Sequence, residues 1–325
     1  MAAATAALVL VPVGASRAGS LLDILKGSSE DSSKHDKSSA HAAGPKQDAS
    51  SKHVASTKHT ATPKPHHVKV AALGPTNLPA SALKPPSKCE PAKFRIVLDV
   101  GHTAESEGAT SARNVPEFSY NLRLAQQVAE KLKAGGFAET RLLVTEGKAK
   151  PSLFKRVAVA NDLNADLFLS IHHDSVPDKF LEDWEFEGQK SHFSDRFGGY
   201  SVWVSHENPE FKTSLAFAEL IGKEMKARGL QYARQYTMPV MGHYQHPLLD
   251  KETGVYAHDE LVVLRKTSMP AVLLEAGSII NRDEELQMDS SERRDAISGA
   301  VIAAVKNFCV PQATSSARAE KATGP

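Results

Sequence analysis

The chain has 325 residues, of which 41% are hydrophobic and 24% are charged, and its formal net charge is +1. This length allows one large domain or two small ones, and the near-neutral charge gives no general attraction to nucleic acid. No apolar run is long enough to span a bilayer. We therefore expect neither a nucleic-acid partner nor a transmembrane segment.

The chain begins with an apolar segment that is typical of export. Residues 1–26 open with MAAATAALVLVPVGASRA, in which the small residues Ser16 and Ala18 suit signal cleavage, although no basic residue precedes the apolar core. We interpret these residues as a leader or a partial signal peptide. An exported, periplasmic protein is the expected consequence.

Residues 27–90 form a tract rich in Ser, Lys, His and Pro, with few branched apolar or aromatic residues. Such a composition cannot bury enough surface to offset the entropy of ordering, so it predicts a disordered linker. Between Lys34 and Lys88 it carries nine lysines against two aspartates, Asp36 and Asp48, and its histidines are irregularly spaced. This pattern favours a solvated basic tether over a metal-binding tail. Residues 313–325 are similarly expected to form a disordered C-terminal tail.

Alternating strand and helix patterns begin at about residue 91 and continue to about residue 312. The strand-like runs are 94–100, 139–144, 166–171, 200–204 and 271–275, and the helical patterns are 117–135, 152–163, 212–228 and 291–308. Regular alternation predicts one α/β domain, 91–312, with a mostly parallel twisted sheet and helices on both faces.

Metal-binding and acid–base residues occur where three of these strands end. His102 follows "VLDVG", His172 and His173 follow "DLFLSI", and Glu275 follows "AVLL". A fourth candidate, Glu117, opens the first helix behind a proline. In parallel sheets, ligands bind beyond the carboxyl ends of the strands, so these residues are expected to share one site.

Two imidazoles and one carboxylate form a familiar zinc set that leaves a coordination position open. Bound zinc lowers the pKa of water to about 7, and a further carboxylate can then accept its proton. Glu275 suits that second role, because a charge beside a buried strand is costly without a purpose or a partner. The simpler alternatives are strand-end histidines, a first-turn Glu117 favoured by the helix dipole, and a structural ion pair of Glu275 with Arg265 or Arg282.

Four blocks of the sequence resemble the zinc-dependent N-acetylmuramoyl-L-alanine amidases of the Amidase_3 type. They are, in order, RIVLDVGHTAESEGA, EFSYNLRLAQQVAEKL, LFKRVAVANDLNADLFLSIHHDS and LVVLRKTSMPAVLLEAGSIINRDEE. The resemblance implies a peptidoglycan hydrolase that cuts the amide between N-acetylmuramic acid and L-alanine. It implies Zn²⁺ held by His102, Glu117 and His172, with Glu275 as the catalytic glutamate. Asn121, His173 and Arg265 are expected to bind substrate, although a structural role for Arg265 stays open.

Two motifs of the chain depart from the family pattern, and His173 stands where the family often has alanine. "GHTA" stands where the family usually has "GHGG", and "EAGS" stands where it has "EAGF" or "ELGF". Neither departure touches an expected ligand, so both concern the fit of the substrate. Two other functions remain open: a zinc peptidase acting on peptidoglycan stem peptides, and an inactive wall-binding module. An activator protein is a further candidate partner.

Cys89 and Cys309 flank the expected domain. We predict a disulfide that joins the two ends of the domain in an oxidising compartment; the alternative is two unrelated thiols, with Cys309 a small buried hydrophobe.

The connection 176–199 is long for a loop and carries several aromatic residues. Some members of the resembling family cover the zinc with an inserted helix. The resemblance therefore suggests that this segment lies over or beside the groove and limits access. Glu182, Glu185 and Glu187 are candidates to reach the metal, although a solvated acidic face is the commoner explanation.

Overall fold

The computed structural model describes residues 89–310 of the chain. The leader 1–26, nearly all of the linker 27–90 and the tail 313–325 lie outside the described residues. Among residues 89–310, no helix has the length and apolarity needed to cross a membrane.

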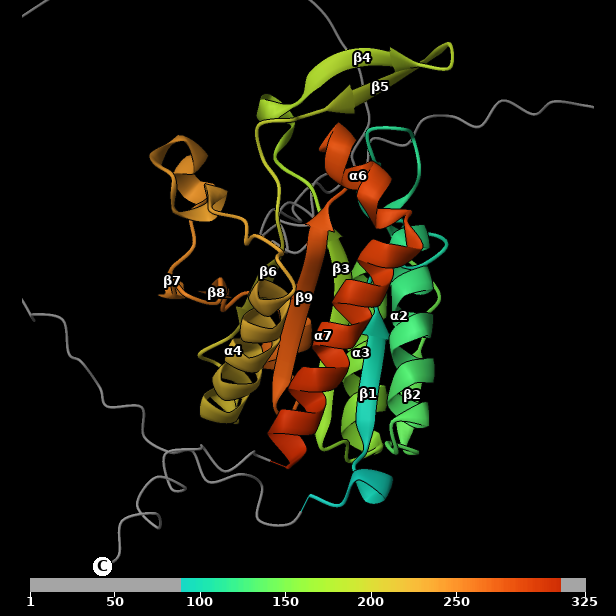
Figure 1. Cartoon of the computed structure of the whole chain (residues 1–325), viewed down its shortest axis with the longest axis vertical. Coiled ribbons are helices and arrows are strands. Elements are labelled where there is room, and N and C mark those ends of the chain that lie inside the picture. The colour runs from blue at the N-terminus through green and yellow to red at the C-terminus, as the bar shows by residue number, and fades with distance from the viewer. Residues whose placement is uncertain (1–88, 311–325) are drawn as a thin grey trace, which may run out of the picture. The chain divides into compact units, whose positions relative to one another are not determined.

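A seven-stranded sheet forms the centre of the domain (Figure 1). Its strand order is β2-β1-β3-β9-β6-β8-β7. β1 pairs in parallel with β2 and β3, β3 in parallel with β9, and β6 in parallel with β8, whereas β6 runs antiparallel to β9 and β7 antiparallel to β8. The predicted α/β class with a mostly parallel sheet is confirmed. The strands are β1 Ile96–Val100, β2 Thr140–Leu143, β3 Leu167–Asp174, β6 Ser201–Val204, β7 Leu248–Asp250, β8 Val255–Ala257 and β9 Ala271–Ser278.

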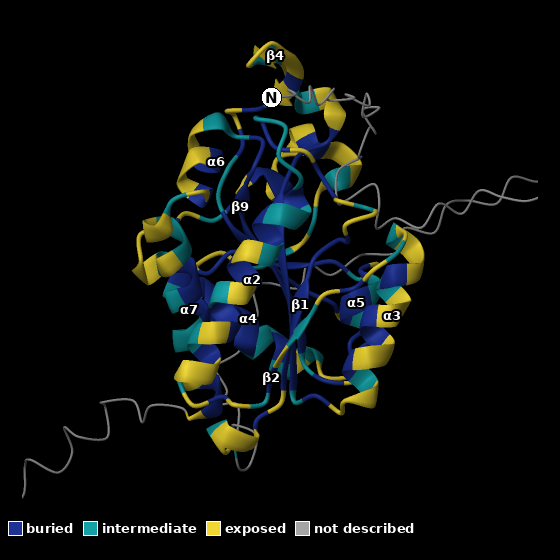
Figure 2. Ribbon diagram, turned by 90° about the vertical axis from the view of Figure 1, so that its right-hand side faces the viewer, coloured by how far each residue is buried: buried dark blue, intermediate teal, exposed yellow. Residues whose placement is uncertain are grey.

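Helices cover both faces of the sheet, and their outer surfaces are exposed while the strands between the two edge strands are buried (Figure 2). On one face, α2 (Glu117–Ala134), α4 (Phe211–Ala227) and α7 (Ser291–Cys309) share one apolar cluster with the even-numbered side chains of β1. On the other face, α3 (Ala149–Asp162) and α5 (Val262–Arg265) share a second cluster with Val97. The remaining helices are α6 (Arg282–Met288) and the 3-10 turns η1 (Pro91–Lys93), η2 (Asp178–Phe180), η3 (Gln235–Thr237) and η4 (Pro239–Tyr244).

Helix α2 illustrates how the local sequence sets its boundaries. Its apolar positions recur every three or four residues, and the predicted face, which includes Leu124, Val128 and Leu132, is buried. Pro116 precedes the first turn, and Gly136 adopts a φ of 98° just past the end. Glycine reaches this left-handed conformation without strain, so the helix stops there.

The structure adds to the expected elements and changes the ends of two strands. The strands predicted at 166–171 and 271–275 continue to Asp174 and Ser278, so His172 and Glu275 lie within strands and not beyond their ends. Short elements that lack a clear hydrophobic period, such as β7, β8 and α6, were not predicted. The connection 176–199, for which no element was predicted, contains a two-stranded hairpin, with β4 at Glu182–Phe186 and β5 at Gln189–Phe193.

The predicted disulfide between Cys89 and Cys309 is present, with the two Cα atoms 5.1 Å apart. Cys309 ends α7, and Cys89 lies just before η1 and β1. The bond therefore fastens the first strand of the domain to its last helix across a sequence separation of 220 residues.

Replacing both cysteines with serine should lower the free energy of unfolding by about 2–5 kcal/mol, because a cross-link over a long loop restricts the unfolded chain. Urea denaturation of the oxidised protein and of Cys89→Ser/Cys309→Ser measures the difference. Zinc content should stay the same, because the expected ligands His102, Glu117 and His172 lie at the other end of the strands. Two free thiols in the oxidised protein would contradict the bond.

Candidate metal centre and active site

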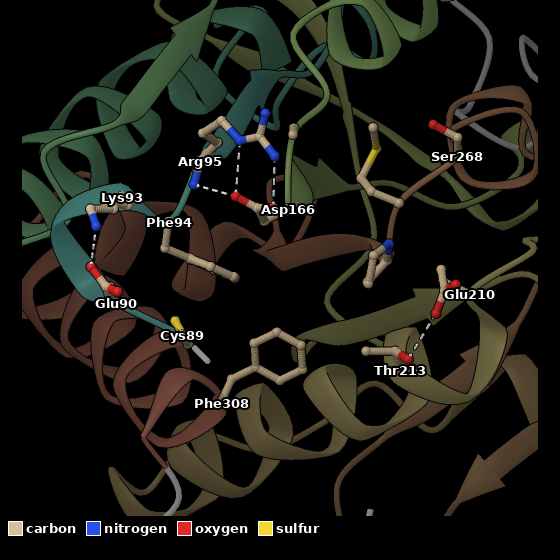
Figure 3. A pocket seen from close by; sticks show the side chains of 13 residues that line it. Cys89, Glu90, Lys93, Phe94, Arg95, Asp166, Glu210, Thr213, Ser268 and Phe308 are labelled. Carbon is tan, nitrogen blue, oxygen red and sulfur yellow. Dashed lines mark hydrogen bonds and ion pairs between the residues drawn. The ribbon is translucent and has the colours of Figure 1, made fainter. Parts of the chain in front are cut away.

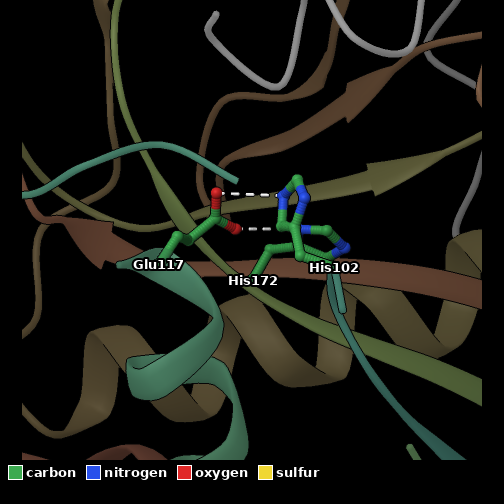
Figure 4. Close-up of side chains that lie close together, drawn as sticks. All are labelled: His102, Glu117 and His172. Atoms are coloured by element: carbon green, nitrogen blue, oxygen red, sulfur yellow. Dashed lines mark hydrogen bonds and ion pairs between the residues drawn. The ribbon is translucent and has the colours of Figure 1, made fainter. Parts of the chain in front are cut away.

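His102, Glu117 and His172 meet at the carboxyl-terminal edge of the sheet (Figure 4). One ligand atom from each lies within 4.8 Å of the others. Nε2 of His102 is 3.0 Å from Oε2 of Glu117, and Nδ1 of His172 is 3.0 Å from Oε1 of the same carboxylate. These three residues form the one group of His, Cys, Asp or Glu side chains found among residues 89–310 that could hold a metal ion.

Three different elements bring these side chains together. His102 follows β1 and adopts a φ of 66°, a left-handed conformation that is uncommon for a residue with a side chain. His172 lies in β3, which pairs with β1, and Glu117 is the first residue of α2. Gly101 makes room for His172, because a Cβ atom at position 101 would lie 2.4 Å from Cε1 of that ring.

The charges of the cluster suit a cation. Burial opposes ionisation of Glu117, but the adjacent His102 and His172 outweigh it and hold the pKa of its carboxyl well below the usual range. Burial lowers the pKa of His172, which favours the neutral imidazole that binds metals. His102 Nε2 is buried and makes no hydrogen bond, although it faces the carboxylate. An orphaned nitrogen beside an anionic carboxylate and a neutral imidazole fits a divalent metal ion such as zinc.

Glu275 lies next to this cluster in the sheet. It is the register partner of His172 between β9 and β3, and it is 1% exposed. Burial raises the pKa of its carboxyl well above the usual value, and the nearby Asp174 and Glu117 add to the rise. Neither of its carboxylate oxygens has a hydrogen-bond partner among the described residues.

The structural alternative for Glu275 was an ion pair with Arg265 or Arg282. Arg265 instead lies 3.3 Å from a carboxylate oxygen of Glu207, and Arg282 pairs with Asp195. A buried carboxylate without a cation or a donor is expensive to maintain in a folded chain. The absence of such a partner among the described residues distinguishes Glu275 from an ordinary structural glutamate.

Asn121 and His173 are both buried beside Glu117 and away from solvent. Nδ2 of Asn121 donates to Oε1 of Glu117 at 3.0 Å, and its Oδ1 lies 2.8 Å from Nδ1 of His173. The backbone N–H groups of His173 and Ala109 also donate to the Glu117 carboxylate. These contacts orient the carboxylate; the expectation that Asn121 and His173 bind substrate stays a prediction. Arg265 is in α5 and is joined to Glu207 at the surface, apart from the cluster.

Sequence reasoning missed Asp174 and Tyr236. Asp174 ends β3 on the same face as His172, and its buried carboxylate accepts a hydrogen bond from the Tyr236 hydroxyl. Burial raises the pKa of Asp174 to about 7, and its charge contributes to the raised pKa of Glu275. The two-residue step in "HHD" was the available signal, because alternate residues of a strand share a face.

The hairpin β4–β5 is fastened beside the segment that joins His102 to Glu117. Trp184 Nε1 and Ser191 Oγ each donate to the carbonyl oxygen of Ala112 at 2.8 Å. The glutamates of the hairpin, Glu182, Glu185 and Glu187, are exposed. They do not belong to the His102–Glu117–His172 cluster found in the described part of the chain.

A cavity of about 650 Å³ lies at the amino-terminal ends of the strands, away from the cluster. Figure 3 shows the side chains that line it. Its lining comes from the segments that precede β1, β3 and β9 and from the disulfide region, and includes Arg95, Asp166 and Phe308. Ligands of open α/β sheets bind at the carboxyl ends of the strands. The His–Glu–His cluster, and not this cavity, is therefore the candidate active site.

Comparison with known proteins identifies the family. The model of the Amidase_3 family, described as N-acetylmuramoyl-L-alanine amidase, matches residues 96–307. The chain therefore belongs to the Amidase_3 family of N-acetylmuramoyl-L-alanine amidases and is an enzyme of the hydrolase class. The family inferred from the four sequence blocks is thus confirmed.

Individual relatives agree with this assignment. N-acetylmuramoyl-L-alanine amidase AmiA of Escherichia coli (strain K12) is 27% identical over 251 residues, which cover 69% of this chain and 79% of AmiA. The crystal structure of the amidase Ami1 from Mycobacterium smegmatis matches with a TM-score of 0.51 and 21% identity, and covers 68% of this chain and 98% of that one. At this identity the likeness to Ami1 establishes the fold alone.

Replacing His102 with alanine should weaken zinc binding by more than about 100-fold, because loss of a ligand should exceed the 10–100-fold effect of an outer-shell partner. Metal analysis after dialysis against a weak chelator measures the loss. His192→Ala, on the exposed surface of β5, is the matched control and should keep its zinc. Full zinc content in His102→Ala would contradict the ligand assignment.

Proposed function

We propose that this amidase is zinc-dependent and hydrolyses the amide between N-acetylmuramic acid and the L-alanine of the peptidoglycan stem peptide. Family membership supports a peptidoglycan amidase. The observation that carries the metal proposal is the buried cluster of His102, Glu117 and His172, with donor atoms within 4.8 Å of one another. Two imidazoles and a carboxylate are a usual ligand set for catalytic zinc.

When bound, zinc would supply a positive charge that polarises the amide carbonyl and lowers the pKa of a water molecule. Glu117 would hold its carboxylate in place through the donors from Asn121, Ala109 and His173. Glu275 would accept the proton of the attacking water on a carboxylate oxygen that makes no hydrogen bond with any described residue. It would then deliver that proton to the departing nitrogen of L-alanine, as general acid–base catalysis requires.

Digestion of purified peptidoglycan, followed by mass spectrometry of the new termini, tests the cleavage site. The proposal predicts free muramyl lactyl groups together with stem peptides that begin at L-alanine. Cleavage inside the stem would instead identify a peptidase, and the absence of new termini despite wall binding would identify an inactive module.

Export to the periplasm is part of the same proposal. The substrate lies outside the cytoplasm, and the curated relatives include cell wall amidases. The disulfide between Cys89 and Cys309 supports an oxidising compartment, because such bonds are rare in reducing ones. An activator protein stays a prediction.

Replacing Glu275 with glutamine should lower the rate by about 10²–10⁴-fold, the range typical for loss of a general base. The amide keeps the size of the side chain but cannot take up the proton. The variant should retain zinc and still sediment with insoluble peptidoglycan. Metal content and amide cleavage are measured on one preparation.

The matched control is Glu130→Gln, an exposed glutamate of α2, which should cleave at the wild-type rate. A near wild-type rate in Glu275→Gln would make this glutamate structural. Loss of zinc in the same variant would make Glu275 a ligand.

Replacing residues 178–198 with a short Gly/Ser linker tests whether the hairpin limits access to the site. If it does, cleavage of insoluble peptidoglycan should rise several-fold while zinc content is unchanged. Trp184→Phe/Ser191→Ala is the control, since it removes both donors to Ala112 but keeps the hairpin. Unchanged or lower activity in a folded deletion variant argues against gating.

A further inference from the structure

A buried ion pair lies directly behind the metal-binding cluster. Arg156, in α3, and Asp99, in β1, are 1% and 0% exposed. Nη1 of Arg156 lies 2.9 Å from Oδ1 and 3.0 Å from Oδ2 of Asp99. The pair belongs to neither the metal ligands nor the proposed base.

The guanidinium also holds the backbone that carries His102. Its Nη1 donates to the carbonyl oxygen of Val100, and its Nη2 donates to the carbonyl oxygen of His102. The carbonyl between them, on Gly101, accepts from Nδ2 of Asn121 at 3.2 Å. Three consecutive carbonyl oxygens are therefore fixed by side chains from two helices on opposite faces of the sheet.

This anchoring coincides with an unusual backbone conformation. His102 has a φ of 66°, which costs free energy in a residue with a side chain and persists only where the surroundings enforce it. The fork of Arg156 spans the residues on either side of Gly101, so it acts where the chain turns out of β1. That turn determines where the His102 imidazole points.

Asp99 in turn fixes the guanidinium of Arg156. It also connects β1 to β3, the strand that carries His172. Ser170 Oγ donates to Oδ2 of Asp99 at 2.7 Å, and the two residues are register partners between β3 and β1. Ser170 precedes His172 by two positions, on the same face of β3. One network thus joins the two strands that provide the histidines.

The cost of the pair indicates that it serves more than packing. The free-energy cost of removing two charges from water is large. Well-packed apolar residues commonly stabilise a core as well as a buried ion pair does, or better. An apolar pair in this position would leave the carbonyl oxygens of Val100 and His102 without their donors. The planar, multi-donor geometry of arginine meets both needs, which a lysine cannot.

We propose that Arg156, oriented by Asp99, is a positioning residue that sets the backbone of His102 in the geometry required for metal binding. This inference rests on the proposed zinc site. It assigns Arg156 no contact with substrate or with the reacting atoms.

The test compares zinc affinity in three full-length variants by competition with a chromophoric chelator. Arg156→Lys keeps the charge but loses the fork. Asp99→Asn/Arg156→Met removes both buried charges together, so that neither is left unpaired. Arg95→Met breaks the exposed Arg95–Asp166 pair at the other end of β1 and serves as the matched control.

We expect the first two variants to bind zinc 10–100-fold more weakly, the range typical for loss of an outer-shell partner, and the control to bind as the wild type does. The absorption spectrum of the Co²⁺-loaded proteins, a readout of ligand geometry, should change in the first two variants only. Unfolding midpoints of the zinc-free proteins separate a loss of fold from a loss of geometry.

Wild-type affinity and an unchanged Co²⁺ spectrum in a folded Arg156→Lys or Asp99→Asn/Arg156→Met would overturn the positioning role and leave the zinc site intact. Absence of zinc binding by the wild-type protein would instead overturn the proposed function, and this inference with it.

Discussion

Parallel pairing of β1, β3 and β9 is the constraint on which the site depends. Because the three strands run in one direction, their carboxyl ends meet at one edge of the sheet. His102 emerges from the first strand, while His172 and Glu275 are register partners on the other two. Strand pairing alone therefore brings together two histidines and a glutamate that are far apart in the sequence. α2 then adds Glu117 from one face.

The pleat of the strands divides the polar residues between the two faces. Ser170, His172 and Asp174 alternate along β3 with residues of the larger apolar cluster. His173 points to the opposite face, where it meets Asn121 of α2. The same alternation explains why the adjacent histidines contact Glu117 in different ways. The ring of His172 faces the Glu117 carboxylate, whereas His173 donates its backbone N–H to it.

The sequence was sufficient for five of the seven strands of the sheet and for the four long helices, because each has a strong local signal. It also placed the disulfide and the cluster, through the positions of two cysteines at the edges of the domain and of polar residues at strand ends. Apolar runs marked the strands, and polar residues at their ends marked the site. The antiparallel entry of β6 and the hairpin depend on long-range pairing that no short window contains. The buried contacts of Asn121 were equally out of reach, because they depend on how α2 lies against β3. Asp99 was visible as a charge inside an apolar strand, but its partner Arg156 is 57 residues away.

The segment between His102 and Glu117 shows why the site requires the whole domain. Ala112 donates its N–H to the carbonyl oxygen of Ile279, just after β9, and accepts from Trp184 and Ser191 of the hairpin. Its neighbour Arg113 pairs with the buried Glu285 of α6. The loop that joins His102 to Glu117 is thus held by elements that follow it by about 70 to 170 residues. These contacts require β9, the hairpin and α6, so the geometry of the His102–Glu117–His172 cluster is a property of the completed fold.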